Sequence, residues 1–389
     1  MDRRDGSNDY VIRVLGDPAE LDAGAWDALH DAQPSATPFT RHAYLNALTA
    51  SGSATEDTGW QPVFLTVHRG GELVGACPLY VKSHSYGEYV FDWAWADAYH
   101  RHGLTYYPKL LSAVPFTPVP GPRLMARDTG ARLALLQAIR QFATEAGLSS
   151  AHILFLDAAD QAAAQEAGWL MRSTVQFHWM QREPAPYADF ADFLADMTRD
   201  KRKKIQQERR RVQEAGVTFT AHEGEAISGE DWDFFYRCYT RTYHEHRSTP
   251  YLTRDFFARM QGHMAGNWLL FIAWRDGSRV AASLIAIDPE RGHAFGRYWG
   301  ATDAIPHLHF EACYYQPLEW CIARGFRRFE GGAQGEHKMA RGLLPVATWS
   351  AHWLAHPQFA EAVAQHLARE GEGVADYLDE LNSRRPFKA

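Results

Sequence analysis

The chain has 389 residues, which is long for one domain and suits two domains of about 150–200 residues each. Its net charge of -7 excludes a protein that wraps nucleic acid over its whole surface, because such proteins are basic overall. Four cysteines lie within apolar runs and form no CxxC pair, which indicates buried thiols in a reducing compartment. No stretch has the roughly 18 continuous apolar residues of a membrane span, so we expect a soluble, cytoplasmic protein.

The first half begins with helices near residues 22–31 and 39–50, which precede a β-hairpin at 63–79. Runs rich in Val, Leu and Phe flank two glycines there, and glycine supplies the positive φ that a tight hairpin turn requires. A loop rich in polar and aromatic residues follows at 82–109. An apolar helix that ends at Gly147 and a short strand come next.

The second half begins with a basic helix at 199–215. Helices at 229–247 and 253–264 precede a second hairpin at 270–286. Residues 357–382 are typical of a last amphipathic helix.

Three segments of the first half recur in the same order in the second half. The hairpin at 63–79 aligns without gaps with that at 270–286, and each is followed by an apolar helix ending in glycine and by a strand. The stretches 168–180 and 342–354 also match, since both close on His-Trp. A repeat of this kind decides the architecture, because each copy is expected to fold the same way.

The repeat predicts two copies of one α/β domain, with mixed central sheets flanked by helices. We expect the first copy to span residues 9–183 and the second to span 184–389. The second copy then includes the basic helix 199–215 and the C-terminal helix.

This order of elements resembles the fold of the GNAT acyltransferases, and a tandem pair is similar to the Fem-type peptidyltransferases. Residues 309–343 resemble the Fem pattern of a long helix, an Arg-Gly-aromatic turn, a strand closing on Gly-Gly and a lysine in a loop. Residues 79–124 resemble the hallmark of a Fem-like family described as peptidoglycan biosynthesis/recognition proteins. The resemblance implies tandem duplicated GNAT-like domains of the acyl-CoA N-acyltransferase type.

Two departures bear on what the resemblance implies. Neither 301–311 nor 121–132 fits the Arg/Gln-x-x-Gly-x-Gly/Ala loop with which acetyl-CoA enzymes hold a pyrophosphate. The helix at 199–215 is too short to form the coiled-coil arm of some Fem enzymes.

The loop at 82–109 is the first candidate site, because a merely solvated loop would not carry so many aromatic residues. Cations mixed with aromatic rings suit a phosphorylated, sugar or peptide ligand. The alternative is a long covering loop whose rings pack onto the sheet. The candidate binding residues are Lys82, His84, Tyr86, Asp92, Trp95, His100, Tyr107 and Lys109.

The loop at 330–341 is the second candidate, because ligands of open α/β sheets bind at strand ends. Glu330 and His337 are the candidate proton acceptors, and Lys338 and Arg341 are placed to face an anion. The resemblance implies that Lys338 contacts a substrate phosphate, while an ordinary surface loop is the alternative. Gln334 and Glu336 complete the candidate binding residues of this loop.

Two further groups of residues allow a structural and a functional interpretation. Arg297 and Tyr298 end a strand and are candidate binding residues, although an ion pair of Arg297 with Glu330 or Glu311 is slightly favoured. The sequence His307-Leu-His309-Phe-Glu311 contains zinc-type ligands, but positions two apart on a helix point in different directions. We therefore expect no metal site.

The basic run at 199–211 is able to contact RNA or an anionic lipid surface. Its charges surround the helix and are interrupted by glutamates, which favours a solvated face. The Fem resemblance keeps tRNA as a partner, because those enzymes take aminoacyl groups from tRNA.

The leading hypothesis is an acyl- or aminoacyltransferase that forms an amide on an amine of an anionic acceptor, such as a peptidoglycan precursor. We expect no tightly bound cofactor, and the donor is either an aminoacyl-tRNA or an acyl-CoA. The alternatives are a GNAT N-acyltransferase that uses a CoA thioester and a non-catalytic protein that binds a peptidoglycan-like ligand. Under the leading hypothesis the first copy holds the acceptor and the second places the donor.

Overall fold

A computed structural model of the chain describes residues 3–5, 10–333 and 335–388. It contains two compact units, and neither is continuous in sequence. The first comprises Met1–Thr174 and Ala347–Asp376, and the second comprises Val175–Val346 and Tyr377–Ala389.

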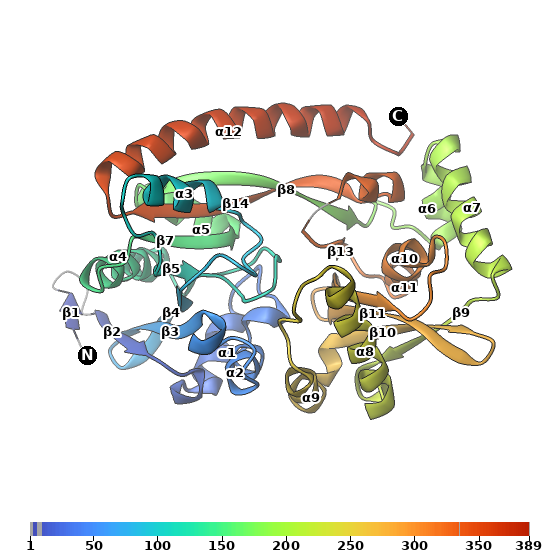
Figure 1. The fold of residues 1–389 in the computed structure, drawn as a ribbon, viewed down its shortest axis with the longest axis horizontal. Coiled ribbons are helices and arrows are strands. Elements are labelled where there is room, and N and C mark those ends of the chain that lie inside the picture. The colour runs from blue at the N-terminus through green and yellow to red at the C-terminus, as the bar shows by residue number, and fades with distance from the viewer. Residues whose placement is uncertain (1–2, 6–9, 334, 389) are drawn as a thin grey trace. The chain divides into compact units, whose positions relative to one another are not determined.

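The first unit is a mixed sheet with helices on both faces (Figure 1). Its strand order is β1-β2-β3-β4-β5-β7-β14, in which only β5 and β7 are parallel. Its strands are β1 (Arg3–Asp5), β2 (Tyr10–Leu15), β3 (Trp60–Arg69), β4 (Glu72–Lys82), β5 (Lys109–Ser112), β6 (Met125–Ala126), β7 (Ser150–Leu156) and parts of β8 (Leu170–Met180) and β14 (Leu344–Leu354). The short strand β6 pairs with β4. Its helices are α1 (Ala23–Asp31), α2 (His42–Ala50), α3 (Trp93–Arg101), α4 (Thr129–Glu145), α5 (Ala158–Glu166) and most of α12 (Pro357–Ser383).

The second unit repeats this plan with the strand order β8-β13-β12-β11-β10-β9, in which only β12 and β13 are parallel. Its strands are β9 (Thr218–Glu223), β10 (Trp268–Arg275), β11 (Ser278–Asp288), β12 (His293–Ala301) and β13 (Arg328–Glu330), besides the end of β8. Its helices are α6 (Phe190–Asp196), α7 (Arg199–Glu214), α8 (Gly229–Glu245), α9 (Arg254–His263), α10 (Leu308–Phe310), a π-turn at Glu311–Tyr315 and α11 (Gln316–Ala323). The predicted α/β fold with mixed central sheets flanked by helices is confirmed.

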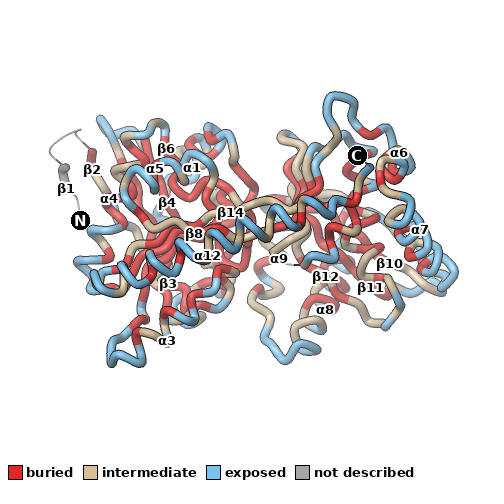
Figure 2. The backbone as a smooth tube through the Cα atoms, turned by 90° about the horizontal axis from the view of Figure 1, so that it is seen from above, coloured by how far each residue is buried: buried red, intermediate tan, exposed pale blue. Residues whose placement is uncertain are grey.

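Alternating side chains of the strands cover the two faces of each sheet. On β3, Phe64 packs edge-on against Trp26 of α1 at 5.7 Å, while Leu65 joins the core beneath α4. On β10, Trp268 packs against Trp232 of α8 at 6.3 Å, while Phe271 joins the core beneath α11. Each sheet is therefore buried on both faces, as the buried strands in Figure 2 show.

The predicted hairpins form where their turn residues require them. Gly70 and Gly71 adopt φ of 60° and 87°, and Asp276 and Gly277 adopt 51° and 73°. Positive φ at both central residues matches the right-handed twist of the flanking strands, so each hairpin closes in two residues.

The last strand of each sequence copy pairs within the other unit. β14 lies antiparallel to β7, with Trp353 opposite Ala151, and β8 lies antiparallel to β13, with Trp179 opposite Phe329. The units therefore differ from the single boundary at 183/184 that the sequence predicted, because strand pairing follows hydrogen bonds and not chain order. Within the described residues, no helix combines the length and apolar character that a membrane crossing needs.

Candidate functional site

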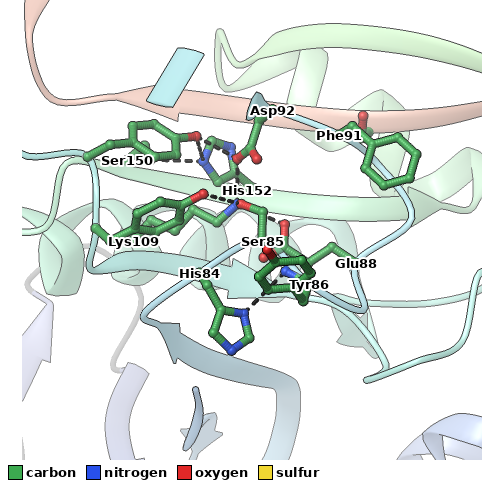
Figure 3. Close-up of polar contacts among 12 residues, drawn as sticks. His84, Ser85, Tyr86, Glu88, Phe91, Asp92, Lys109, Ser150 and His152 are labelled. Atoms are coloured by element: carbon green, nitrogen blue, oxygen red, sulfur yellow. Dashed lines mark hydrogen bonds and ion pairs between the residues drawn. The ribbon is translucent and has the colours of Figure 1, made fainter. Parts of the chain in front are cut away.

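The loop after β4 encloses its charged residues in the first unit (Figure 3). The Lys109 ammonium donates to Glu88 Oε2 at 2.8 Å and also contacts the Asp92 carboxylate. Lys82 is fully buried, with its ammonium 3.6 Å from the centre of the Trp60 ring. This arrangement leaves neither ammonium on the surface, where an anionic ligand was expected to meet Lys82 and Lys109.

Burial and pairing set the protonation states of this cluster. Burial raises the pKa of Glu88 to about 7 and lowers the pKa of Lys82 to about 7. Burial also acts to raise the pKa of Asp92, but Lys109 outweighs it and holds that pKa well below its usual range. The pKa of Lys109 is raised, since Glu88 and Asp92 outweigh the effect of its burial.

A buried histidine pair extends the cluster. The Tyr106 hydroxyl donates to Asp92 at 2.6 Å and lies 3.1 Å from His152 Nε2. His152 Nδ1 lies 2.8 Å from His352 Nδ1, and the Trp95 ring packs edge-on against His352 at 4.9 Å. Burial lowers the pKa of His152 to about 3 and that of His352 well below its usual value, so both rings are neutral. Asp92 and Trp95 thus belong to the interior of the unit.

The other predicted residues of this loop are more accessible. His84 donates from Nε2 to the carbonyl of Thr58 at 3.1 Å, and the Tyr107 hydroxyl lies 2.8 Å from that of Ser85. Tyr86 and His100 are exposed. The structure therefore separates the predicted set into a buried ionic group and an outer group that is mainly aromatic.

The second unit has a bulge between β11 and β12 that the equivalent strands of the first unit, β4 and β5, lack. On β12, Gly296 pairs with Ile285 and Tyr298 with Leu284, so Arg297 is an extra residue that makes the strand bulge. The equivalent β4–β5 ladder has no shift of register. Bulges are frequent beside active sites because they interrupt the ladder and redirect nearby groups.

The parallel pair β12–β13 also separates, two residues before the bulge. Its register ends where Phe295 faces Glu330, after which the chain continues into Gly331 and Gly332. A Cβ on Gly331 would lie 2.5 Å from the Leu343 side chain, and Gly332 has a φ of 86°. Glycine is therefore required at both positions.

The same junction in the first unit is closed. The residues after β5 run on beside β7, where the Gly121 amide donates to the carbonyl of Phe155 at 3.0 Å and Gly121 forms a parallel bridge with Leu156. The chain itself thus occupies the place at which β12 and β13 separate in the second unit.

A cavity of about 130 Å³ lies at the separation of β12 and β13. It is enclosed by β11, β12, the helix that begins at Leu308 and the two glycines after β13. Its lining residues are Ser283, Ile285, Gly296, Arg297, Tyr298, Trp299, His309, Cys313, Tyr314, Gly331 and Gly332.

Two proton-carrying side chains meet beside this cavity, and Tyr314 is the one that lines it. Tyr314 lies in the π-turn, and its hydroxyl is 3.2 Å from His337 Nε2. Burial lowers the pKa of His337, and Arg341 and Lys338 lower it further, so the imidazole is neutral near pH 7. Single π-turns within helices are often found at functional sites.

Lys338 is the buried cation of the loop at 330–341. Its ammonium donates to the carbonyl of Gly332 at 3.1 Å, next to the cavity. Burial lowers its pKa to about 8. A lysine held in this way is charged at neutral pH and close to losing its proton.

Other residues of this loop are bound within the unit. Arg341 forms an ion pair of 3.0 Å with Glu208 of α7 and lies over the Phe310 ring, so it does not share a free face with Lys338 as the spacing predicted. Glu336 accepts a hydrogen bond of 2.5 Å from the Tyr377 hydroxyl. Gln334 lies outside the described residues.

The remaining candidates flank the cavity. The Glu330 carboxylate is buried, 3.2 Å from the Arg328 guanidinium and 3.8 Å from His178 Nε2. Arg297 donates to the Tyr298 hydroxyl at 3.0 Å. Glu311, one expected partner of Arg297, instead accepts from Arg209 of α7 at 3.1 Å.

A larger cavity of about 490 Å³ shares Trp299 and His309 with the smaller one. Its wall combines a cation and two further imidazoles, from Arg241, His246 and His307. Arg211 of α7 donates to His307 Nε2 at 3.2 Å. Among the described residues, no group of three or more potential ligands is arranged to hold a metal ion.

A family model described as peptidoglycan biosynthesis/recognition matches residues 17–389, which is nearly the whole chain. The chain belongs to the FemAB-like family. Comparison with curated protein sequences finds no match.

Solved structures similar to the FemAB-like chain share its fold. FemX is 10% identical over 90% of this chain and 100% of its own, with a TM-score of 0.53. L-PGS from Bacillus licheniformis is 12% identical over 90% and 98%, with a TM-score of 0.54. The C-terminal DUF2156 domain of a protein from Agrobacterium fabrum, named as a candidate lysylphosphatidylglycerol synthetase, is 11% identical over 90% and 96%, with a TM-score of 0.52.

The sequence identified the strand ends around the cavity of the FemAB-like chain but missed one wall of it. His309, Cys313 and Tyr314 come from a helix that reads as an ordinary amphipathic element. The π-turn that directs Tyr314 toward His337 has no sequence signature. His309 was considered only as a metal ligand, and the tyrosine pair Tyr314-Tyr315 among apolar residues is the other signal that could have indicated this wall.

Proposed function

We propose that the FemAB-like chain transfers an acyl or aminoacyl group to an amine, at the small cavity of the second unit. The Tyr314–His337 pair beside the bulge of β12 is the observation that carries this proposal. It joins a neutral proton acceptor and a hydroxyl donor at a break in the sheet, as amide formation requires. The closed junction at Gly121 favours a single reaction site, in the second unit.

The reaction needs no covalent enzyme intermediate. The acceptor amine attacks the carbonyl carbon of the donor, a C–N bond forms, and the C–O or C–S bond to the leaving group breaks. His337 takes the proton that the amine loses, and Tyr314 gives a proton to the leaving oxygen or sulfur. Because the two side chains are 3.2 Å apart, a proton passes between them and restores both.

Glu330 is less suited to accept the proton. Its carboxylate is buried and paired with the Arg328 guanidinium at 3.2 Å. Proton acceptance by Glu330 stays a prediction, and we propose that this residue helps to hold β13 against β8.

The acceptor is proposed to be anionic and related to a peptidoglycan precursor. The family description supports that class, and Lys338 is the cation next to the cavity. Arg341 supports Lys338 indirectly, because its ion pair with Glu208 fixes the loop that carries both. Charge-assisted contacts of this kind position a phosphate or carboxylate.

The donor is proposed to be an aminoacyl-tRNA. The face of α7 that points away from its core contacts carries exposed cations, namely Arg199, Lys203, Lys204, Arg210 and Arg211. An exposed row of cations attracts a phosphate backbone. One protein of this fold is named as a candidate lysylphosphatidylglycerol synthetase, and this name describes an aminoacyl product, which supports the same class of donor.

Mass spectrometry of a UDP-linked muropeptide after incubation with the protein tests this function. One arm supplies a mixture of aminoacyl-tRNAs and the other a panel of acyl-CoA thioesters, with a Tyr314→Phe/His337→Asn variant as the matched control. An added aminoacyl mass that the variant fails to produce supports the proposal. Transfer from CoA thioesters alone would establish the other donor class, and binding without transfer in either arm would leave a non-catalytic recognition protein.

A further inference from the structure

The loop at 84–93 carries an unusual group of exposed aromatic side chains. Tyr86, Phe91 and Trp93 are exposed by 58%, 49% and 41%, and they are the only large aromatic residues that are exposed in the described part of the chain. The Tyr86 and Trp93 rings lie 5.2 Å apart, and His84 lies 5.2 Å from Tyr86. Exposed apolar surface concentrated in one short segment indicates an interaction site.

Buried charges hold this loop in place from beneath. Ser85, Glu88 and Asp92, at intervals of three and four residues, all contact the Lys109 ammonium (Figure 3). Arg172 of β8 donates to the Phe91 carbonyl at 2.7 Å. Burying charged groups is costly, so a loop fixed in this way presents its outer residues in one conformation before any ligand arrives.

The outer surface of this loop has no exposed charge. Glu88 and Asp92 are its charged residues, and both are buried, as is Lys82 at the end of β4. The pKa of His84 is lowered, first by burial and then by Lys82, so this ring is neutral as well. Such a surface suits a ligand that is uncharged, flat on one side and able to form hydrogen bonds at its edge.

We infer that Tyr86 and Trp93, whose rings lie 5.2 Å apart, form a binding surface for a sugar ring, specifically the N-acetylated sugar of a peptidoglycan fragment. A pyranose presents apolar C–H groups on one face, which pack on aromatic rings, while its hydroxyls meet the Tyr86 hydroxyl and the Trp93 indole N–H. The family description supports this class of ligand. The inference rests on the proposed function for the class of its ligand.

Calorimetry with three probes tests the assignment. The probes are an N-acetylglucosaminyl–N-acetylmuramyl disaccharide carrying a stem peptide, the stem peptide alone, and vesicles of phosphatidylglycerol and phosphatidylcholine. Tyr86→Ala and Trp93→Ala are each expected to weaken disaccharide binding about 3- to 10-fold, the range for one aromatic contact. Leu104→Ala is the matched control, because it removes an apolar side chain that is 39% exposed outside the loop.

The outcomes separate this inference from the proposed transfer reaction. Disaccharide binding that Tyr86→Ala and Trp93→Ala leave unchanged, with the melting temperature preserved, would overturn the sugar assignment even if transfer is observed. Vesicle binding that depends on Trp93, without disaccharide binding, would overturn it in favour of a lipid surface. Ring-dependent sugar binding by a protein that transfers nothing would support the assignment and refute the proposed chemistry. If Trp93→Ala fails to fold, Trp93→Phe should retain binding and Tyr86→Ala still decides the matter.

Discussion

The Tyr314 hydroxyl lies 3.2 Å from His337 Nε2 at the edge of the small cavity. Replacing Tyr314 with Phe removes the hydroxyl and keeps the ring, so the packing against Phe310 and His309 is retained. We expect transfer to slow by about 100-fold, the lower end of what one positioned proton donor contributes. Single-turnover rates measure the effect, and an unchanged rate in a folded variant would exclude the pair from catalysis.

Affinity for the anionic acceptor should depend on the ionisation of Lys338. Burial lowers its pKa to about 8, and only the protonated ammonium attracts an anion. Acceptor affinity is therefore expected to fall as the pH rises through about 8, while Lys338→Ala binds weakly at every pH. Calorimetry at intervals of about 0.5 pH unit, from about pH 6.5 to about pH 9.5, measures the acceptor affinity. A wild-type profile as flat as that of the variant would remove Lys338 from the acceptor site.

The Arg341–Glu208 ion pair is expected to stabilise the fold of the second unit and not to bind ligand directly. Both side chains are buried, and the Tyr315 hydroxyl also donates to Glu208. Glu208→Gln leaves a buried guanidinium without its counter-charge, which should cost about 3–5 kcal/mol of unfolding free energy. The double change Glu208→Gln/Arg341→Met should recover most of this loss in urea titrations. Equal destabilisation in the double variant would show that packing, and not the lone charge, was lost.

Lys82→Met is expected to stabilise the first unit. The lysine is fully buried over Trp60, and within the described residues its ammonium has no hydrogen-bond acceptor. A methionine fills similar space without the cost of burying a charge, so stability at pH 7 should rise by about 1–4 kcal/mol. Loss of stability would show that the ammonium has a structural partner in solution.

The same substitution should change the dependence of stability on pH. The pKa of Lys82 falls from 10.5 to about 7 in the folded protein, so the unfolded chain holds the extra proton between these values. Wild-type stability from this group therefore increases from pH 7 to pH 10.5 and is lost as the pH falls toward 7. Glu88, Asp92 and Lys109 face the same space, but the raised pKa of Glu88, about 7, acts below this window. Melting temperatures of Lys82→Met should lack the increase.

Exposed cations of α7 should contribute to tRNA binding if tRNA carries the donor. Lys203 and Lys204 are exposed. Lys203→Glu/Lys204→Glu is expected to weaken binding and to reduce the slope of log affinity against log salt by about two. Arg140→Glu, at an exposed position on α4 of the first unit, is the charge control. Equal tRNA affinities for both variants would show that the cations of α7 face solvent and do not bind tRNA.

The fold was readable from local signals. Two-residue turns at Gly70-Gly71 and Asp276-Gly277 fix the hairpins through positive φ, and each hairpin lies between an apolar α helix and the next strand. The basic helix predicted at 199–215 forms as Arg199–Glu214, and it ends just before Gly216, whose φ of 74° stops a helix within one turn. Signals that act over a few residues predict local structure without any knowledge of which segments are neighbours in space.

The candidate site depended on contacts that no local pattern encodes. Lys82 and Lys109 look like surface cations in sequence, yet the carboxylates of Glu88 and Asp92 allow Lys109 to be buried between them. Arg341 and Lys338 are three residues apart, but a glutamate 133 positions away removes Arg341 from the pair. Each of these ion pairs joins residues that are far apart in sequence, so it exists only in the folded chain.

The sequence by itself determined the duplication, the order of the elements and the strand ends at which the candidate site lies. Repeated patterns, turn residues and caps act over a few residues, so they can be recognised in the sequence itself. The tertiary structure alone decided that β8 and β14 pair outside their own copies, that a bulge opens one sheet, and that Tyr314 meets His337. These features depend on hydrogen bonds and burial between segments far apart in sequence, and their free energy exists only in the folded chain.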